Sequence, residues 1–215
     1  MDNRCKEAKI RVDAIFQELE ELGFDVYRPL SINDIELPSH LGYDYGVCRL
    51  VVWDCNYCDY VVKFPLDSSD IKFCEREVDV YKDAEEEGIE EAFAWCKCIY
   101  APEEIGNGIY AMEYVNCNED EISDEVSESA YRRYCEDYDR EVDDDDAREE
   151  FFQDYYGEDE MDDLYDMFLN GLRDWQLRNK VDTFVSEQDI NDIHCGNVGY
   201  RDNQLVLCDY AGYGW

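Results

Sequence analysis

Positive charge is scarce in this sequence of 215 residues. It has 19 lysines and arginines against 56 aspartates and glutamates, for a formal net charge of −37. Nucleic-acid binding needs basic groups opposite the phosphates, so this balance argues against direct binding of nucleic acid. An acidic surface that keeps the protein in solution is the simplest interpretation. Docking of a basic partner and mimicry of a nucleic-acid backbone stay open.

Long apolar runs are also missing. No stretch approaches the ~20 residues that cross a bilayer, and Met1–Lys6 leads into a charged amphipathic segment instead of a signal peptide. We therefore expect a cytoplasmic protein with no membrane partner. With 45% hydrophobic and 14% aromatic residues, the chain can still bury a core, which argues against disorder.

The 11 cysteines have no repeated spacing. Without a secretory signal, reduced thiols are the default. Cys55 and Cys58 form a CxxC at a predicted hairpin turn, and Cys96 and Cys98 form a CxC in a predicted strand. Four thiolates can hold zinc, but the CxC would put both sulfurs on one face of a sheet. We favour buried thiols over a metal site.

The N-terminal part of the chain predicts a helix followed by strands. A helix over residues 3–22 ends at Gly23, and its apolar residues recur at helical spacing: Ile10, Ala14, Ile15, Leu19 and Leu22. A short strand is expected from Phe24 to Tyr27. Residues 47–53 and 60–65 are β-branched runs around a polar turn, which predicts a hairpin.

A second helix is predicted over residues 70–87, followed by strands over 92–100 and 109–115. These elements predict an antiparallel sheet with one crossing helix. Lys63 is a charge within an apolar strand, and a buried lysine needs an anionic partner. Glu77 lies beside the apolar face of the helix and is our candidate. Alternatively, Glu75 and Glu77 only complement the helix dipole.

Residues 118–166 are dominated by acids with interleaved aromatic residues. We expect two acidic helices divided near Asp143–Asp146, each with one packed and one solvated face. A clear apolar stripe then predicts a helix over residues 161–180. A solvated helix face explains the acids better than mimicry does.

The most informative stretch lies near the C-terminal end. A polar loop places Asp192 five residues before Asn197, and a short apolar strand ends at Asp209. Phosphoryl transfer from a nucleotide uses such groups, because one carboxylate orients a hydroxyl while an amide oxygen and a second carboxylate hold magnesium. The alternative is an ordinary polar loop and turn beside a buried strand.

In this order the motifs resemble the protein kinase-like superfamily, from about Leu41 to Gly212. Asp192–Asn197 is similar to the catalytic loop, in the form used by small-molecule phosphotransferases and atypical microbial or viral kinases. The resemblance assigns roles to ten residues: Gly42 and Gly46 in the nucleotide loop, Lys63 and Glu77 as the nucleotide-binding ion pair, Met112, Glu113 and Val115 around the adenine base, Asp192 as catalytic residue, and Asn197 and Asp209 as magnesium ligands.

The resemblance implies an α+β, bilobal fold. Residues 1–115 would hold an N-terminal helix and an N-lobe of antiparallel sheet with one crossing helix. Residues 116–215 would form a minimal, mostly helical C-lobe with an acidic helical insert, and Lys63 and Asp209 would face one cleft. The implied activity is transfer of the γ-phosphate of ATP, with Mg²⁺, to a protein or small-molecule hydroxyl, on a substrate that the acidic surface suggests is basic. A pseudokinase and an acidic interaction or decoy protein are the alternatives.

Overall fold

The computed structural model describes residues 3–30, 37–100, 108–155 and 158–210. These residues form two compact units, one up to Val115 and one over Asn116–Tyr210. The two units are described separately below. The predicted division into domains of residues 1–115 and 116–215 stays a prediction.

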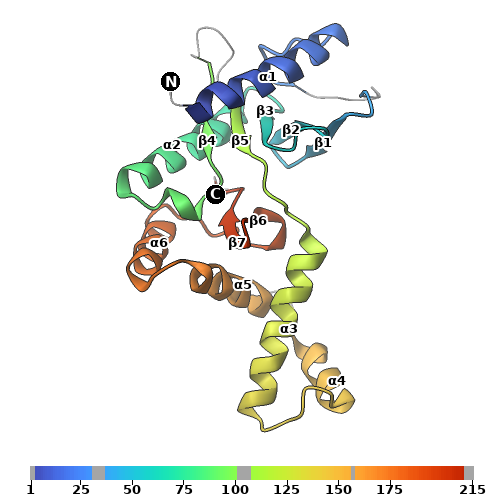
Figure 1. Cartoon of the computed structure of the whole chain (residues 1–215), viewed down its shortest axis with the longest axis vertical. Coiled ribbons are helices and arrows are strands. Elements are labelled where there is room, and N and C mark those ends of the chain that lie inside the picture. Colours follow the sequence, from blue (N-terminus) through green and yellow to red (C-terminus); the bar gives the residue numbers. More distant parts are fainter. Residues whose placement is uncertain (1–2, 31–36, 101–107, 156–157, 211–215) are drawn as a thin grey trace. The chain divides into compact units, whose positions relative to one another are not determined.

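The first unit is built on a five-stranded antiparallel sheet (Figure 1). Its strand order is β1-β2-β3-β5-β4. The strands are β1 (Leu41–Tyr45), β2 (Arg49–Asp54), β3 (Tyr60–Pro65), β4 (Cys96–Lys97) and β5 (Tyr110–Glu113). The hairpin predicted around the polar turn is confirmed as β2–β3, and the two later strands are shorter than expected.

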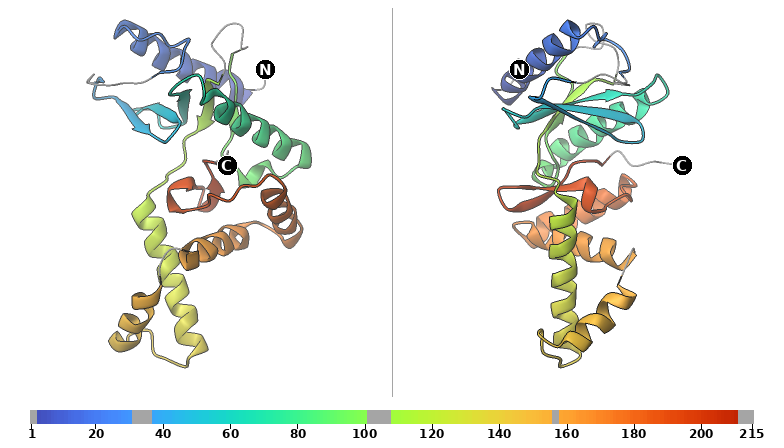
Figure 2. Two further views of the ribbon diagram at one scale, coloured as in Figure 1. Left: turned by 180° about the vertical axis from the view of Figure 1, so that it is seen from behind. Right: turned by 90° about the vertical axis from the view of Figure 1, so that its right-hand side faces the viewer.

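One helix covers each face of this sheet (Figure 2). Successive strand residues point to opposite faces, so Phe64 and Lys63 of β3 face different helices. Phe64 packs on Phe16 of α1 (Asn3–Glu21), with ring centroids 5.8 Å apart. Lys63 faces α2 (Ile71–Glu87), which it contacts through Glu77. A 3₁₀ turn, η1 (Glu90–Ala92), links α2 to β4.

Both predicted helices of the first unit are confirmed, together with their glycine ends. Gly23 has φ +91°, and the next residue, Phe24, donates its N–H to the carbonyl of Leu19 at 3.0 Å. Gly88 after α2 has φ +68°. Residues with a Cβ rarely adopt these angles, which is why glycine ends both helices.

The apolar stripe expected over residues 3–22 is confirmed in part. Ile15 and Leu19 are buried, whereas Ile10 is 64% exposed and Ala14 and Leu22 are also exposed. The buried side chains are those of Ala8, Val12, Ile15, Phe16 and Leu19. Both sets have helical spacing, and contact between the rings of Phe16 and Phe64 accompanies the observed one.

The strand expected at Phe24–Tyr27 is also wrong, because these residues form a turn. The Asp25 carboxylate accepts the N–H of Tyr27 at 3.2 Å. Aspartate often closes a turn through its own side chain in this way, and this local bond replaces strand pairing.

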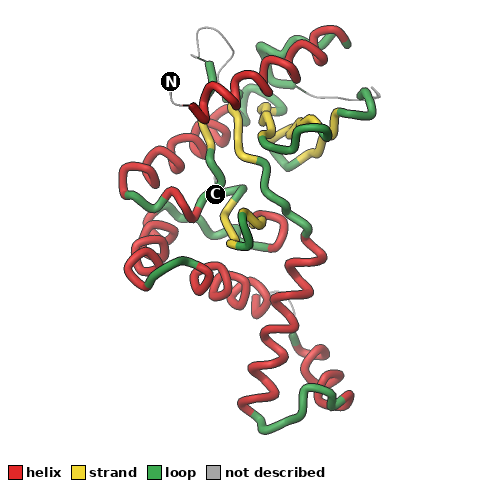
Figure 3. The backbone as a smooth tube through the Cα atoms, viewed as in Figure 1, coloured by secondary structure: helices red, strands yellow, loops and turns green. Residues whose placement is uncertain are grey.

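The second unit is mostly helical and carries one two-stranded hairpin (Figure 3). Its elements are α3 (Glu119–Asp137), α4 (Asp145–Asp154), α5 (Glu158–Gly171), α6 (Trp175–Glu187), the 3₁₀ turn η2 (Cys195–Asn197), β6 (Val198–Arg201) and β7 (Gln204–Leu207). The long helix α3 packs against α5, which also contacts α6 and the hairpin of β6 and β7.

The predicted pair of acidic helices is confirmed as α3 and α4. The Asp144 side chain caps α4 by accepting the N–H groups of Asp146 and Ala147. Between the helices lies a cluster of aromatic rings with centroid separations of 4.7 to 6.5 Å. Its members are Tyr131, Tyr134, Tyr138, Phe151, Phe152 and Tyr155. Aromatic packing on one face therefore accompanies solvated acids on the other.

A single helix over residues 161–180 is not what the structure shows. The chain leaves α5 after Gly171 and starts α6 at Trp175, which is 67% exposed. The Asp174 side chain accepts the N–H groups of Gln176 and Leu177. This N-cap starts a new helix. The prediction followed the continuous apolar stripe and overlooked Asp174, although aspartate is a typical N-cap residue.

The predicted fold class is confirmed. The chain is α+β, with an N-terminal antiparallel sheet flanked by helices and a mostly helical C-terminal part. Of the helices within the described ranges, none has the length and apolar character needed to cross a membrane.

Gly42 provides a test of the sheet. Gly42 lies opposite Trp53 in the β1–β2 register, and a Cβ on Gly42 would lie 2.3 Å from the indole ring. We expect Gly42→Ala to lower the free energy of unfolding by ~1–3 kcal/mol, the usual cost of overpacking. Urea denaturation measures the change. Gly46→Ala is the control, because its nearest contact would be 3.7 Å away; equal losses would contradict this packing.

Candidate functional site

A buried ionic cluster lies between the sheet and α2 in the first unit. One carboxylate oxygen, Oε2 of Glu77, accepts hydrogen bonds from three groups. Lys63 Nζ lies at 3.1 Å, Arg49 Nη1 at 2.5 Å, and the Tyr110 hydroxyl also donates to this oxygen. Arg49 additionally donates to the Tyr110 hydroxyl at 3.2 Å. The expected pairing of Lys63 with Glu77 is therefore present.

Burial and charge act in opposite directions on this cluster. Glu77 is fully buried, Arg49 is 4% exposed and Lys63 is 6% exposed. Burial alone would raise the pKa of Glu77, but the positive charges of Arg49 and Lys63 and the hydrogen bonds outweigh it and lower that pKa. Burial and the neighbouring carboxylate raise the pKa of Tyr110. Glu77 is thus held ionised and Tyr110 neutral.

Two cations, Arg49 and Lys63, surround the one carboxylate of Glu77. Sequence reasoning missed Arg49. Its signal is the same as that of Lys63, a single cation within an apolar strand, and the strand register places both on one face of the sheet.

An apolar surface adjoins Lys63 on that same face. The register puts Val61 opposite Trp53 on one side and opposite Met112 on the other. Val61 and Met112 are buried, while Trp53 is partly exposed. Apolar side chains and the flat indole ring of Trp53 beside a cation suit a ligand with a planar apolar part and a negative part.

The predicted glycines lie on the first hairpin. Gly42 is inside β1, and Gly46 is in the short loop to β2, where its N–H donates to the Arg49 carbonyl at 2.9 Å. The Trp53 ring lies against Gly42. Because Gly42 has no side chain, the indole ring of Trp53 can pack against its backbone. The glycine pattern did not predict this packing role.

The predicted base-facing residues lie at the end of β5. Met112 is 1% exposed, and the Glu113 N–H donates to the Trp95 carbonyl at 2.7 Å. The Glu113 side chain pairs with Arg4 at 2.9 Å. Val115 is buried two residues beyond the strand. The Glu113 N–H and the Glu113 side chain are therefore both engaged within the first unit.

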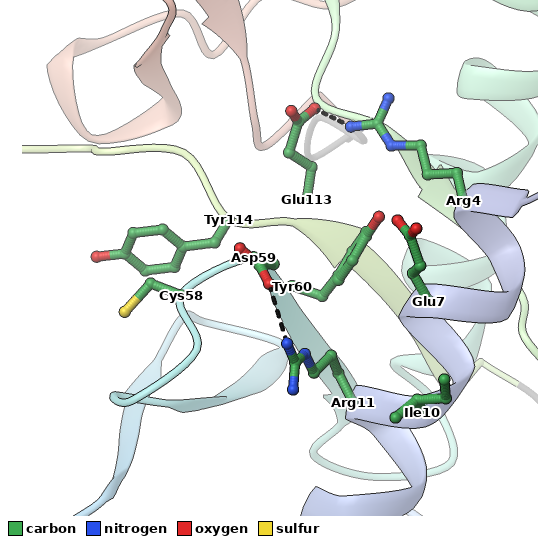
Figure 4. A pocket seen from close by; sticks show the side chains of 9 residues that line it. All are labelled: Arg4, Glu7, Ile10, Arg11, Cys58, Asp59, Tyr60, Glu113 and Tyr114. Atoms are coloured by element: carbon green, nitrogen blue, oxygen red, sulfur yellow. Dashed lines mark hydrogen bonds and ion pairs between the residues drawn. The ribbon is translucent and has the colours of Figure 1, made fainter.

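A pocket of the first unit lies on the other face of the sheet. It has a volume of 610 Å³ and lies between α1 and the start of β3 (Figure 4). Two arginines of α1 point into it, and each meets an acid: Arg4 pairs with Glu113 and Arg11 pairs with Asp59 at 3.4 Å. Of the predicted site residues, only Glu113 lines this pocket, so it is separate from the Lys63 cluster.

In the second unit, hydrogen bonds bring the predicted loop and strand together. The Asn197 side-chain amide donates to the Asp192 carbonyl at 2.8 Å. The Cys208 N–H donates to the Asn197 carbonyl at 3.0 Å, which places the following residue, Asp209, beside the loop. All three predicted residues are partly exposed. Because the amide nitrogen of Asn197 donates, its oxygen remains as the acceptor.

The sequence prediction did not include β6, which pairs with β7, the strand that precedes Asp209. β6 pairs with β7, and the turn between them is formed by Asp202 and Asn203, both with positive φ. Asp and Asn tolerate that conformation and are typical of two-residue hairpins. The Asp202–Asn203 dipeptide was therefore the feature of the sequence that could have predicted this hairpin.

His194 is a further loop residue without a predicted role. Its Nδ1 accepts the Gly196 N–H at 3.1 Å, and its Nε2 lies 3.9 Å from a carboxylate oxygen of Asp192. The next residue, Cys195, is buried, and burial and Glu160 raise its pKa to about 11. His194 therefore orders the loop locally and lies beside the Asp192 side chain.

Carboxylate and amide oxygens such as those of Asp209 and Asn197 are the ligands that magnesium prefers. The donor set fits that metal with phosphate oxygens completing the coordination. Within the described part of the chain, no group of three or more His, Cys, Asp or Glu side chains could hold a metal.

Comparison with known proteins gives little at the level of sequence. No protein-family model matches the chain, and no curated protein matches it. Among solved structures, the chain is similar to APH(2")-IIa, an aminoglycoside phosphotransferase with a protein kinase-like fold, in a ternary complex with streptomycin and ATP. The match covers 92% of this chain and 69% of the other, at 16% identity and a TM-score of 0.36. At this distance it assigns no residue roles.

The ionic cluster predicts a large cost for removing its one carboxylate. Glu77→Ala leaves Arg49 and Lys63 buried without it, so we expect a loss of ~3–5 kcal/mol in the free energy of unfolding. Glu75→Ala, an exposed acid on the same helix, should change it by less than ~0.5 kcal/mol. Urea denaturation of both variants distinguishes a buried pair from charges that only complement the helix dipole, for which the two losses would be equal.

Proposed function

We propose that the protein is an ATP-dependent phosphotransferase that uses magnesium and has a protein kinase-like fold. The observation that carries this proposal is the buried pair of Lys63 on β3 and Glu77 on α2, beside an apolar sheet surface. A lysine held by a helix carboxylate is the arrangement by which kinases present a cation to nucleotide phosphates.

In the first unit, each predicted residue receives a part in nucleotide binding. Lys63, held by Glu77, neutralises phosphate charge, and the hairpin with Gly42 and Gly46 lies over the phosphates. Met112 contributes to the apolar surface for the base. The backbone of Glu113 and Val115 faces the base.

In the second unit, Asp192 accepts a hydrogen bond from the substrate hydroxyl and orients it. Asn197 and Asp209 would hold magnesium, which when bound neutralises charge on the phosphates. The hydrogen bond from Asn197 to Asp192 fixes both residues in one loop. Positioning and charge are the main demands of phosphoryl transfer, and fixed polar groups meet them.

The acceptor is a hydroxyl of a protein or a small molecule. A net charge of −37 favours a basic acceptor through electrostatic attraction. The proposal assigns the protein to the cytoplasm, with no nucleic acid or membrane as partner.

The Trp53 ring over Gly42 favours a second candidate, a pseudokinase that acts by binding a partner. A covered glycine cannot bring its backbone close to a phosphate. The pseudokinase binds a nucleotide or none, and transfers no phosphate. An acidic decoy is the third candidate, and its partner binding would collapse with added salt.

Nucleotide binding is tested by thermal stability. Mg·ATP at ~100 times its dissociation constant should stabilise the wild type by ~2.7 kcal/mol. Asp209→Asn should lose most of this stabilisation, because it removes the carboxylate assigned to the metal. Asp202→Asn, an exposed acid of the same hairpin, should keep it. Equal shifts in both variants would remove Asp209 from the site.

Catalysis is tested separately with labelled ATP, magnesium and pools of candidate acceptors. The wild type should transfer label, and Asp192→Ala should reduce the rate by at least ~100-fold, the usual contribution of a positioned acid or base. A wild type that binds Mg·ATP and labels no acceptor would favour the pseudokinase. A wild type and Asp192→Ala with equal rates would refute the role of Asp192.

A further inference from the structure

Two thiols meet beside the proposed metal-binding turn. The Sγ atoms of Cys117 and Cys208 lie 3.2 Å apart although 91 positions separate them in the sequence. Cys117 is exposed and Cys208 is buried. The pair lies entirely within the second unit, so its geometry is that of one compact body.

Backbone hydrogen bonds hold the two cysteines together. Asn116, just before Cys117, forms an isolated antiparallel bridge with Tyr200 of β6. The Cys208 N–H donates to the carbonyl of Asn197, just before β6. Both cysteines are therefore anchored to the same short strand, and their contact does not depend on side-chain rotamers alone.

The separation of these sulfurs is close to that of a bond. A disulfide has an S–S distance of about 2.05 Å, so the two atoms need to approach by roughly 1 Å. The CxxC in the first unit is arranged differently. The Cys58 sulfur there points to the carbonyl oxygens of Asp54 and Cys55, at 3.8 and 3.5 Å.

We propose that Cys117 and Cys208 form a reversible disulfide, and that this disulfide weakens metal-nucleotide binding by Asp209. The oxidant is a peroxide. The exposed Cys117 thiol attacks hydrogen peroxide, the O–O bond breaks, and Cys117 becomes a sulfenic acid with release of one water. The Cys208 sulfur then attacks the Cys117 sulfur, the S–S bond forms, and the sulfenic oxygen leaves as a second water. A dithiol reductant returns two electrons and two protons and restores both thiols.

The regulatory effect follows from adjacency and rests on the proposed function of Asp209. Cys208 directly precedes Asp209, so drawing the Cys208 sulfur toward Cys117 moves the peptide that carries this carboxylate. The same peptide is hydrogen-bonded to Asn197, the other proposed ligand. Displacement of ligand groups by about 1 Å is enough to lower the efficiency of such a site strongly.

The cross-link is tested without reference to nucleotide. Full-length protein is treated with equimolar hydrogen peroxide, digested after its acidic residues without reduction, and analysed by mass spectrometry. We expect the Cys117–Cys208 peptide pair as the main cross-link, reversed by dithiothreitol and absent from Cys117→Ser. Cys98→Ser, which removes an exposed cysteine of the first unit, should form it normally. No cross-link, or main cross-links between other cysteines, would overturn the proposal.

The regulatory half is tested by Mg·ATP titration of reduced and oxidised protein. Oxidation should weaken binding at least fivefold in the wild type and Cys98→Ser, and leave Cys117→Ser unchanged. Equal affinities in both states would refute regulation. If the reduced wild type binds no Mg·ATP, the proposed function and the regulation both fail, while the mass spectrum still decides whether the disulfide forms.

Discussion

The carboxylate of Glu77 is the point on which the first unit depends. It accepts hydrogen bonds from Arg49 on β2, Lys63 on β3 and Tyr110 on β5. These strands are neighbours in the sheet, and Glu77 belongs to the helix on one of its faces. Burying charges costs free energy unless they are paired and hydrogen-bonded. The cluster therefore fixes the position of α2 on the sheet, since a shifted helix would leave two cations buried without their carboxylate.

The scarcity of bases makes this cluster informative. With 19 lysines and arginines against 56 acids, the bases are too few to pair one to one with the acids, so most acids must remain solvated. Other bases form ion pairs between helices of the second unit: Arg148 pairs with Glu128, and Arg133 pairs with Asp163. In the first unit, by contrast, Arg49 and Lys63 are both buried around the one carboxylate of Glu77. In α3 and α4, aromatic packing supplies the stabilisation that the acids cannot.

The sequence predicts the parts of the fold that depend on local chemistry. Gly23 and Gly88 end their helices as expected, and the polar turn before β3 closes a hairpin. Predictions failed where distant contacts decide. Ile10 of α1 is exposed, whereas Phe16 is buried against Phe64, and Arg49 joins the site only through sheet register. Asp192 and Asn197 were expected in a polar loop, but the pairing of β6 with β7 after this loop was not predicted, because the turn at Asp202 was overlooked.

The two units offer complementary chemistry. The cluster of the first unit contains Arg49, Lys63 and Glu77, whereas the loop and turn of the second carry the side-chain oxygens of Asp192, Asn197 and Asp209. Under the proposed function, the phosphates of a nucleoside triphosphate would require a cation such as Lys63, and its magnesium would require oxygen ligands. Cys117 and Cys208 both lie in the second unit, so the proposed disulfide would act on the metal ligands of that unit.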